Sequence, residues 1–412
     1  MNIFTLAARR LRGMSAFVLV LLVVEFVDEF AFGGLEAALP LIRTDLGLSY
    51  DQVGLLLTLP PLLANLLFEP VLGILGDTWK RRVLVLGGGV GFALAALMVS
   101  GSGSFAVLMI AMILFNPSSG AFVNLSQSTL MDIDPQRHEQ NMARWTFAGS
   151  VGVVAGALVI GLLVSLGQGW RTFYLLVGVV TVMTLIVLWR LPFPRNHQSD
   201  EASPHLMAGL RDGLREAGRA LRRREVVRWS LLLEFSDFML DVLHGYLALY
   251  FVDVVGVDEA QAGFAVAIWT GVGLIGDFAI IPLLNHVRGI TYLRFSAALE
   301  FVLYSAFLIV PGLVPKLILI GVIGFFNAGW YAILQGNLYS AMPGRSGTVM
   351  TVGNIFGLAS SFVPLMIGLA AEHFGLEAAM VFPLLGCVAL LVGLPRRQVS
   401  QPAESPGPHA AG

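Results

Sequence analysis

The chain has 412 residues, of which 56% are apolar and only 13% are charged, and its formal net charge is −2. Soluble globular proteins carry about 25% charged residues, so this composition excludes a soluble fold and indicates many membrane spans. A single cysteine, Cys387, excludes an internal disulfide and a cysteine-based metal cluster. The basic N-terminal residues run into an apolar stretch without an A-x-A cleavage pattern, so we expect no cleavable signal peptide.

Twelve apolar segments follow one another along the chain. Each is close to the roughly 20 residues that a helix needs to cross a bilayer, and they begin near residues 16, 51, 83, 105, 145, 171, 229, 261, 293, 316, 347 and 377. We therefore predict an all-α polytopic membrane protein with twelve transmembrane helices in two six-helix bundles. Its expected parts are a cytoplasmic N-terminus (1–15), a first bundle (16–190), a cytoplasmic linker (191–228), a second bundle (229–394) and a disordered cytoplasmic tail (395–412).

The positive charges predict the orientation of these spans. All 25 Lys and Arg residues fall in loops or at helix ends, and with the N-terminus inside, all but Arg43, Arg171 and Lys316 lie on the cytoplasmic side. Cytoplasmic loops are enriched in Lys and Arg. We therefore expect a multi-pass protein of the plasma membrane, the inner membrane in a bacterium, with both termini in the cytoplasm.

Span 1 is unusual because four carboxylates interrupt its apolar sequence, namely Glu25, Asp28, Glu29 and Glu36. At about 100° per residue they fall on one stripe of the helix. An ionised acid in mid-membrane costs about 2.5–3.5 kcal/mol on insertion scales. We therefore expect the stripe to face a wet or protein-lined interior and not lipid.

The two halves of the chain repeat. A shift of 209 residues aligns Glu25 and Asp28 of span 1 with Glu234 and Asp237 of span 7 without a gap. Because six spans separate the equivalent positions, the two bundles insert with the same topology. They are therefore predicted to be pseudo-symmetric about an axis along the membrane normal.

The loop after span 2 reads G-I-L-G-D-T-W-K-R-R from Gly73 to Arg82. It resembles the signature loop of the major facilitator superfamily, broadly G-x-L-x-D-R-x-G-R-R, with Thr78 and Lys80 in place of the usual Arg and Gly. The resemblance extends over residues 16–395 and implies a secondary active transporter that works by alternating access. It also implies that spans 1, 4, 7 and 10 line a central cavity and that the loop holds the halves closed on the cytoplasmic side.

Two departures leave the subfamily unassigned. Proton-coupled members often carry an Arg four residues before a Gly in span 4, whereas here Asn116 precedes Gly120 at that spacing. Span 5 also lacks the Gly-Pro motif of drug antiporters. Its glycines, Gly152 and Gly156, and their counterparts Gly353 and Gly357 in span 11, predict close helix packing.

Polar residues of the four cavity spans are the candidate site. The residues expected to bind substrate or protons are Asp28, Glu29, Glu36, Asn116, Asp237, Asp241, His244, Asn327, Trp330, Tyr331 and Gln335. The residues expected to form the cytoplasmic gate are Glu69, Gly73, Asp77, Arg81 and Arg82. For Glu25 and Glu234, a structural role in bonding neighbouring helices is as well supported as a role in the site. Asp277 and Glu300 are expected to form hydrogen bonds between helices.

The charge of this interior predicts the substrate. No Lys or Arg lies in mid-membrane, and clustered carboxylates in a low dielectric suppress one another's ionisation, so some hold protons at neutral pH. We expect coupling to protons and a small cationic or neutral organic solute, with export as the direction. The expected partners are this solute, protons and the lipid bilayer, with no nucleic acid, no cofactor and no resident metal, and the protein is expected to be a monomer.

Other functions remain open at this stage. Asp241 and His244 with Asp28 or Glu29 would suit a divalent metal cation as substrate, and a sugar or a lysolipid would fit the same scaffold. An intramembrane enzyme with Asp28 and Asp237 as a catalytic pair, or a non-transporting sensor, is the alternative class. The sequence contains no H-E-x-x-H, G-x-S-x-G or P-loop pattern, which argues against an enzyme.

Overall fold

The computed structural model describes residues 16–48, 50–193, 211, 215–257, 259–360 and 363–395. The predicted N-terminus (1–15), most of the linker and all but one residue of the predicted tail lie outside the described residues. Helix α11 begins at Arg224, so its first turn lies within the predicted linker.

Six spans form the first bundle. In chain order they are α2 (Ala16–Leu46); α3 (Tyr50–Leu63), η1 (Ala64–Phe68) and α4 (Glu69–Thr78); α5 (Arg81–Ser100); α6 (Phe105–Ser119), η2 (Gly120–Asn124) and α7 (Leu125–Ile133); α8 (His138–Ser165); and α9 (Trp170–Arg190). The π-helical turns η1 and η2 interrupt spans 2 and 4 just after Pro60–Pro61 and Pro117. Proline lacks the N–H that an α-helix needs and crowds the turn before it, so the helix widens locally.

Six further spans form the second bundle. They are α11 (Arg224–Tyr250) with η4 (Phe251–Val255); α12 (Glu259–Leu283); α13 (Gly289–Ile309); α14 (Leu313–Asn327) with α15 (Trp330–Ala341); α16 (Ser346–Ser360) with α17 (Val363–Phe374); and α18 (Leu376–Ala379) with α19 (Leu384–Gly393). Span 10 is broken between α14 and α15, where Gly329 adopts a positive φ of 83°. Only glycine adopts this backbone conformation at little cost.

Nine helices of the described residues are long and apolar enough to cross a membrane. The three remaining spans are the acidic helices α2 and α11, and α16–α17, in which residues 361–362 are not described. The acids of α2 and α11 explain why these two helices do not meet the limit on charged residues. The described residues form helices and no strand, and their twelve spans fall into two six-helix bundles, so the predicted fold class is confirmed.

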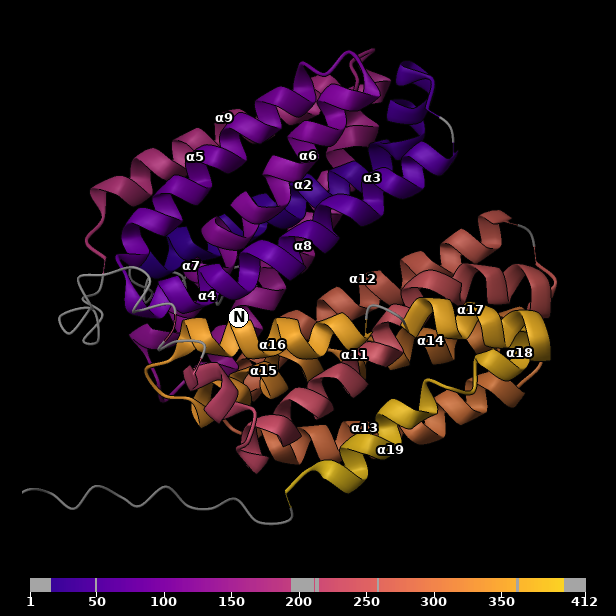
Figure 1. Ribbon diagram of the computed structural model, residues 1–412. Coiled ribbons are helices and arrows are strands. Elements are labelled where there is room, and N and C mark those ends of the chain that lie inside the picture. Colours follow the sequence, from indigo (N-terminus) through magenta and orange to yellow (C-terminus); the bar gives the residue numbers. More distant parts are fainter. Residues whose placement is uncertain are drawn as a thin grey trace, which may run out of the picture.

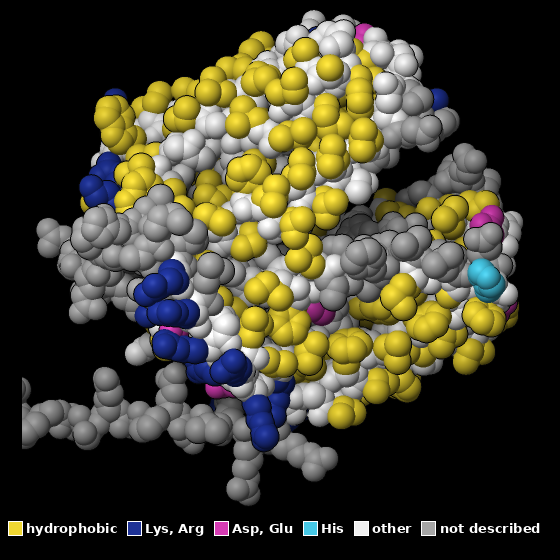
Figure 2. Space-filling view, in the orientation of Figure 1, with side chains coloured by type: hydrophobic (Ala, Val, Ile, Leu, Met, Phe, Trp, Pro, Cys, Tyr) yellow, Lys and Arg dark blue, Asp and Glu magenta, His cyan; other side chains and the backbone are white. Residues whose placement is uncertain are grey.

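The two bundles lie side by side (Figure 1). At one end, which we name the linker end, α4 and α7 of the first bundle meet the start of α16 and the end of α15. Figure 2 shows Lys and Arg side chains gathered at this end, an apolar belt over the outside of both bundles, and a hollow between the bundles at the opposite end, the far end. The structure is therefore closed at the linker end and parted at the far end.

Helix α8 packs against α2 with the two backbones in contact. A Cβ atom added to Gly152 would lie 2.6 Å from the Phe26 carbonyl oxygen, and one added to Gly156 would lie 2.3 Å from that of Phe30. These glycines therefore allow the close approach that the sequence predicts.

Span 11 shows no such contact among the described residues. A Cβ atom added to Gly353 or Gly357 would meet no described atom within 4 Å. Near its start α16 leans onto α4 instead, where a Cβ on Gly347 would lie 2.1 Å from the Gly73 carbonyl oxygen. Contact with the other bundle at the linker end leaves the later glycines of α16 facing open space.

Candidate functional site

A buried carboxylate joins the bundles at the linker end. Asp77, at the end of α4, is only 2% exposed. It accepts hydrogen bonds from the backbone N–H groups of Gly347 and Thr348, at 2.8 and 2.7 Å, and from the Thr348 hydroxyl at 2.7 Å. The first N–H groups of a helix have no partner within the helix and carry a partial positive charge. Asp77 therefore caps α16 from the other bundle.

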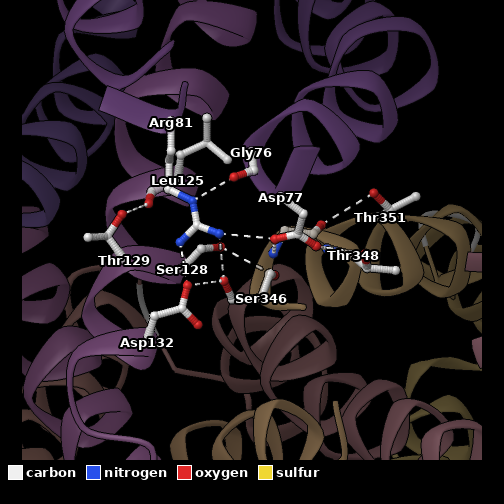
Figure 3. A network of polar contacts seen from close by, with 11 residues as sticks. Gly76, Asp77, Arg81, Leu125, Ser128, Thr129, Asp132, Ser346, Thr348 and Thr351 are labelled. Atoms are coloured by element: carbon white, nitrogen blue, oxygen red, sulfur yellow. Dashed lines mark hydrogen bonds and ion pairs between the residues drawn. The ribbon is translucent and has the colours of Figure 1, made fainter. Parts of the chain in front are cut away.

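Arg81 extends this contact into a network (Figure 3). Its guanidinium donates to Asp77 at 3.0 Å, to Asp132 at 2.5 Å and to the Ser346 hydroxyl at 3.0 Å. Its Nε donates to the Gly76 carbonyl oxygen at 2.8 Å, which fixes the planar fork. Arg82, by contrast, is exposed and donates to the Trp189 carbonyl oxygen, outside the network.

The remaining predicted gate residues continue the contact between α4 and α16 toward the middle of the molecule. A Cβ atom on Gly73 would lie 2.5 Å from the Gly347 carbonyl oxygen, so the two backbones touch here. Glu69, two turns earlier on α4, accepts a hydrogen bond of 2.6 Å from the side-chain amide of Asn354. The five predicted gate residues thus include four that meet α16 directly or through the network.

A second contact between the bundles joins α8 to the loop before α13 and to α15. Glu139 accepts a hydrogen bond of 2.7 Å from Asn337, and its carboxyl packs against the backbone of Gly289. His138 pairs with Ser340 at 2.8 Å, and Gln140 donates to Asn285 at 2.6 Å.

Sequence reasoning missed Glu139 because a charged residue at a helix start is typical of a solvated surface. The signal was present in the second-half counterpart of the signature loop, residues 284–288, which lacks an acid. In the first half the acid stands in this loop, whereas here α8 of the other bundle supplies it.

A cavity of about 460 Å³ lies between the bundles. Its polar wall in the first bundle carries Glu25 and Asp28, which are 8% and 7% exposed, together with Glu29. The second bundle contributes Asp277 and the residues around the break in span 10. Further polar and aromatic side chains of the wall are Asn124, Gln127, Trp145, Ser150, Trp269, Asn327 and Tyr331.

Four of the eleven predicted binding residues lie in the cavity wall. Asp28, Glu29, Asn327 and Tyr331 line the cavity, and Asp28 accepts a hydrogen bond of 2.8 Å from the Ser119 hydroxyl. Glu36, nearer the far end, is exposed. The side chains of Asp241 and His244 lie outside the described residues.

The other predicted residues pack elsewhere. Asn116 is buried and donates to the Met112 carbonyl oxygen of its own helix at 3.0 Å. Trp330 is fully buried and donates from its indole to Ser296 at 2.8 Å. Gln335 is also buried, and Asp237 is half-buried beside the Ser236 hydroxyl, outside the cavity lining.

The cavity extends toward spans 5 and 8, which sequence reasoning did not include. Of the described residues of span 7, Leu240 alone lines it, whereas α8 and α12 contribute a full face each. Thr146 and Ser150, one turn apart on α8 among apolar residues, are the signal that could have pointed to this wall. Within the described ranges no three His, Cys, Asp or Glu side chains stand close enough to hold a metal ion.

Comparison with known proteins identifies the chain. The profile of the Major Facilitator Superfamily matches residues 21–364. The chain belongs to the major facilitator superfamily. As a member, it is a multi-pass membrane transporter and not an enzyme.

Bacterial relatives of this facilitator are similar over most of its length. The probable actinorhodin transporter of Streptomyces coelicolor is 25% identical over 381 residues, which cover 87% of this chain and 63% of that protein. The chain therefore spans less than two thirds of that relative. A chloramphenicol resistance protein of Streptomyces lividans is 24% identical over 381 residues, covering 90% of this chain and 93% of that protein.

Solved structures show the same fold. The Escherichia coli fucose:proton symporter superposes with a TM-score of 0.77 at 14% identity, covering 92% of this chain and 97% of that chain. The human organic anion transporter MFSD10 superposes with a TM-score of 0.75 at 18% identity, covering 92% of this chain and all of the other. At these identities the likeness extends to the fold alone.

Proposed function

We propose that this facilitator works by alternating access, is coupled to protons, and exports a small cationic or neutral organic solute. One observation carries the proposal. The cavity shared by the two bundles contains Glu25, Asp28, Glu29 and Asp277, and none of its described lining residues is Lys or Arg. Such a cavity favours a cation or a proton over an anion, because an anion would need a basic partner.

The distribution of basic residues supports the orientation. Lys and Arg gather at the linker end (Figure 2), and the positive-inside rule assigns that end to the cytoplasm. We therefore place both termini of this monomeric transporter in the cytoplasm and the protein in the bacterial inner membrane. The described state is then outward-facing, with the cavity closed toward the cytoplasm by the contacts of Asp77, Arg81 and Glu139.

Proton coupling follows from the acids of α2. Neighbouring carboxyl groups in a dry site resist ionising together, so they bind protons that an arriving cation can displace. Glu69 lies within electrostatic reach of Asp28 and also bonds Asn354 of the other bundle. It therefore provides a physical link by which the charge of the cavity acts on the contact between α4 and α16.

The relatives support an organic substrate. The names of the probable actinorhodin transporter and the chloramphenicol resistance protein both refer to organic molecules. A divalent metal, a sugar or a lysolipid is the second candidate class, and it is tested in the same assay.

The test is transport in proteoliposomes under an imposed pH gradient, with organic cations, neutral drugs, divalent metals, sugars and lysolipids as probes. Asp28→Asn and Asp237→Asn are compared with wild type, and Asp253→Asn, which changes an exposed acid outside the cavity, is the matched control. We expect Asp28→Asn to lower gradient-driven transport of an organic cation at least about tenfold. Normal transport and coupling in Asp28→Asn would show that this acid of the cavity does not carry the function, and the same result in Asp237→Asn would exclude the acid of α11.

A further inference from the structure

One carboxyl group in the cavity connects the two bundles. Asp277, on α12 of the second bundle, accepts a hydrogen bond of 2.8 Å from the hydroxyl of Ser150, on α8 of the first bundle. Both residues line the cavity. A hydroxyl is a neutral donor, so this contact leaves the charge of an ionised Asp277 without compensation.

The same carboxyl group faces the break in span 10. The N–H of Gly329 points to Asp277, and the phenol of Tyr292 donates to the carbonyl oxygens of Phe326 and Ala328, at 2.9 Å each. The irregular backbone between α14 and α15 is thus held from both sides. In transporters, broken helices lie where backbone and substrate meet in a protein-lined cavity.

Three aromatic side chains contribute to the wall of the same cavity. Trp145 of α8, Trp269 of α12 and Tyr331 of α15 line it together with Asp277. A cation binds over the face of such rings, and a nearby carboxylate adds direct charge compensation. The combination of rings, carboxylates and apolar side chains in one cavity is typical of a site for a bulky organic cation.

We propose that Asp277, with the rings of Trp145, Trp269 and Tyr331, binds the positive group of an organic cation, which displaces the Ser150 hydroxyl from the carboxyl group. The inference rests on the proposed function and narrows its substrate class to cations. Binding exchanges a hydrogen bond between the bundles for a contact with the substrate. The cation therefore competes with a bond of the described, outward-facing state and binds this state less tightly, as release by an exporter requires.

The two partners of this hydrogen bond make a sharp test. In Asp277→Asn the amide oxygen still accepts from Ser150, so the variant keeps the contact between the bundles but loses the negative charge. In Ser150→Ala the charge stays and its competitor is removed. The probe is tetraphenylphosphonium, titrated into wild type and variants in lipid nanodiscs at pH 8, with chloramphenicol as a neutral probe and Asp253→Asn as control.

Opposite effects are expected. Asp277→Asn should weaken tetraphenylphosphonium binding at least about tenfold, and Ser150→Ala should strengthen it by about threefold. Thermal unfolding of each variant checks that it is folded, and binding of the neutral probe should change in neither. If both variants weaken binding of the cation, or if neither alters it, Asp277 serves only as a bond between helices and the inference is overturned.

The test separates this inference from the proposed function. If wild type transports the neutral probe under a pH gradient but does not bind tetraphenylphosphonium, the proposed function stands and the cation site is overturned. If wild type neither binds nor transports any probe of the panel, the proposed function fails, and the cation site fails with it.

Discussion

The first helices of the two bundles, α2 and α11, carry matching acids but are packed differently. Against α2, Gly152 and Gly156 of α8 bring the two backbones into contact, and Glu25 and Asp28 are almost fully buried. In the second bundle the corresponding acids of α11 are half-buried. Equal sequence motifs thus occupy different environments in this state.

The difference lies in what the partner helix touches. Helix α8 seats on α2 within its own bundle, whereas the start of α16 leans onto α4 of the other bundle and leaves Gly353 and Gly357 open. The glycines of α8 also make room for the acids, because a Cβ on Gly149 would lie 2.7 Å from a carboxyl oxygen of Glu25. The glycines of α8 in the first bundle thus position the acids of α2, whereas the glycines of α16 in the second bundle leave space around their helix.

The largest expected effect comes from inserting a side chain into the tight contact between α8 and α2. Gly156→Leu places side-chain atoms where the Phe30 backbone lies and should cost at least about 3 kcal/mol of stability, because neither backbone can move aside. Gly357→Leu is the matched change in open space and should fold normally. Thermal unfolding in detergent compares the two, and equal stability would contradict the difference between the bundles.

A second prediction compares the two contacts at the linker end. Asp77→Ala removes a buried acceptor of four hydrogen bonds, one of them from Arg81, and should open this end strongly, since breaking a buried charged pair costs about 3–5 kcal/mol. Asn285→Ala removes one exposed partner of Gln140 and should have a small effect.

Maleimide labelling provides the measurement for that prediction. Ser128→Cys, in a Cys387→Ser background, puts a thiol at a buried position whose hydroxyl bonds Ser346 across the bundles. Labelling should rise several-fold with Asp77→Ala and little with Asn285→Ala. Equal labelling in both would mean that the acid and the amide hold the linker end to the same degree.

A third prediction separates buried acids inside and outside the cavity. Glu300, on α13, is fully buried and accepts a hydrogen bond of 3.3 Å from Asn327, with its other oxygen unpaired among the described residues. Glu300→Gln keeps its shape and should change stability by less than about 1.5 kcal/mol with transport retained. Loss of gradient-driven transport equal to that of Asp28→Asn would instead make Glu300 a proton carrier.

The smallest expected effect comes from filling the space that Gly149 leaves for the carboxyl group of Glu25. Gly149→Ala should push the flexible end of Glu25 aside, lowering stability by about 1 kcal/mol or less, and should change substrate affinity only a few-fold. Titration of the cation probe and thermal unfolding measure the two effects. No change in affinity would show that the position of the Glu25 carboxyl does not shape the site.

The sequence by itself determined the scaffold. Long apolar segments have no alternative to membrane helices, because every backbone polar group must be paired within the bilayer. The acids of α2 could be assigned to an interior face for the same energetic reason, and Asp28 and Glu29 do line the cavity. The loop around Asp77 and Arg81 was recognisable from the sequence, because its charged residues stand at a fixed spacing beside a membrane span.

Which neighbour covers each face of a helix depends on how the helices pack, and this packing is not contained in any single span. The helical period predicts that Trp330 and Tyr331 point in different directions. The break at Gly329 determines which of the two reaches the cavity, and that residue is Tyr331. The pairing of Ser150 with Asp277 joins residues 127 positions apart on different bundles. Such contacts depend on how the two bundles pack against each other. The pattern of residues along one helix does not contain the angle between the bundles.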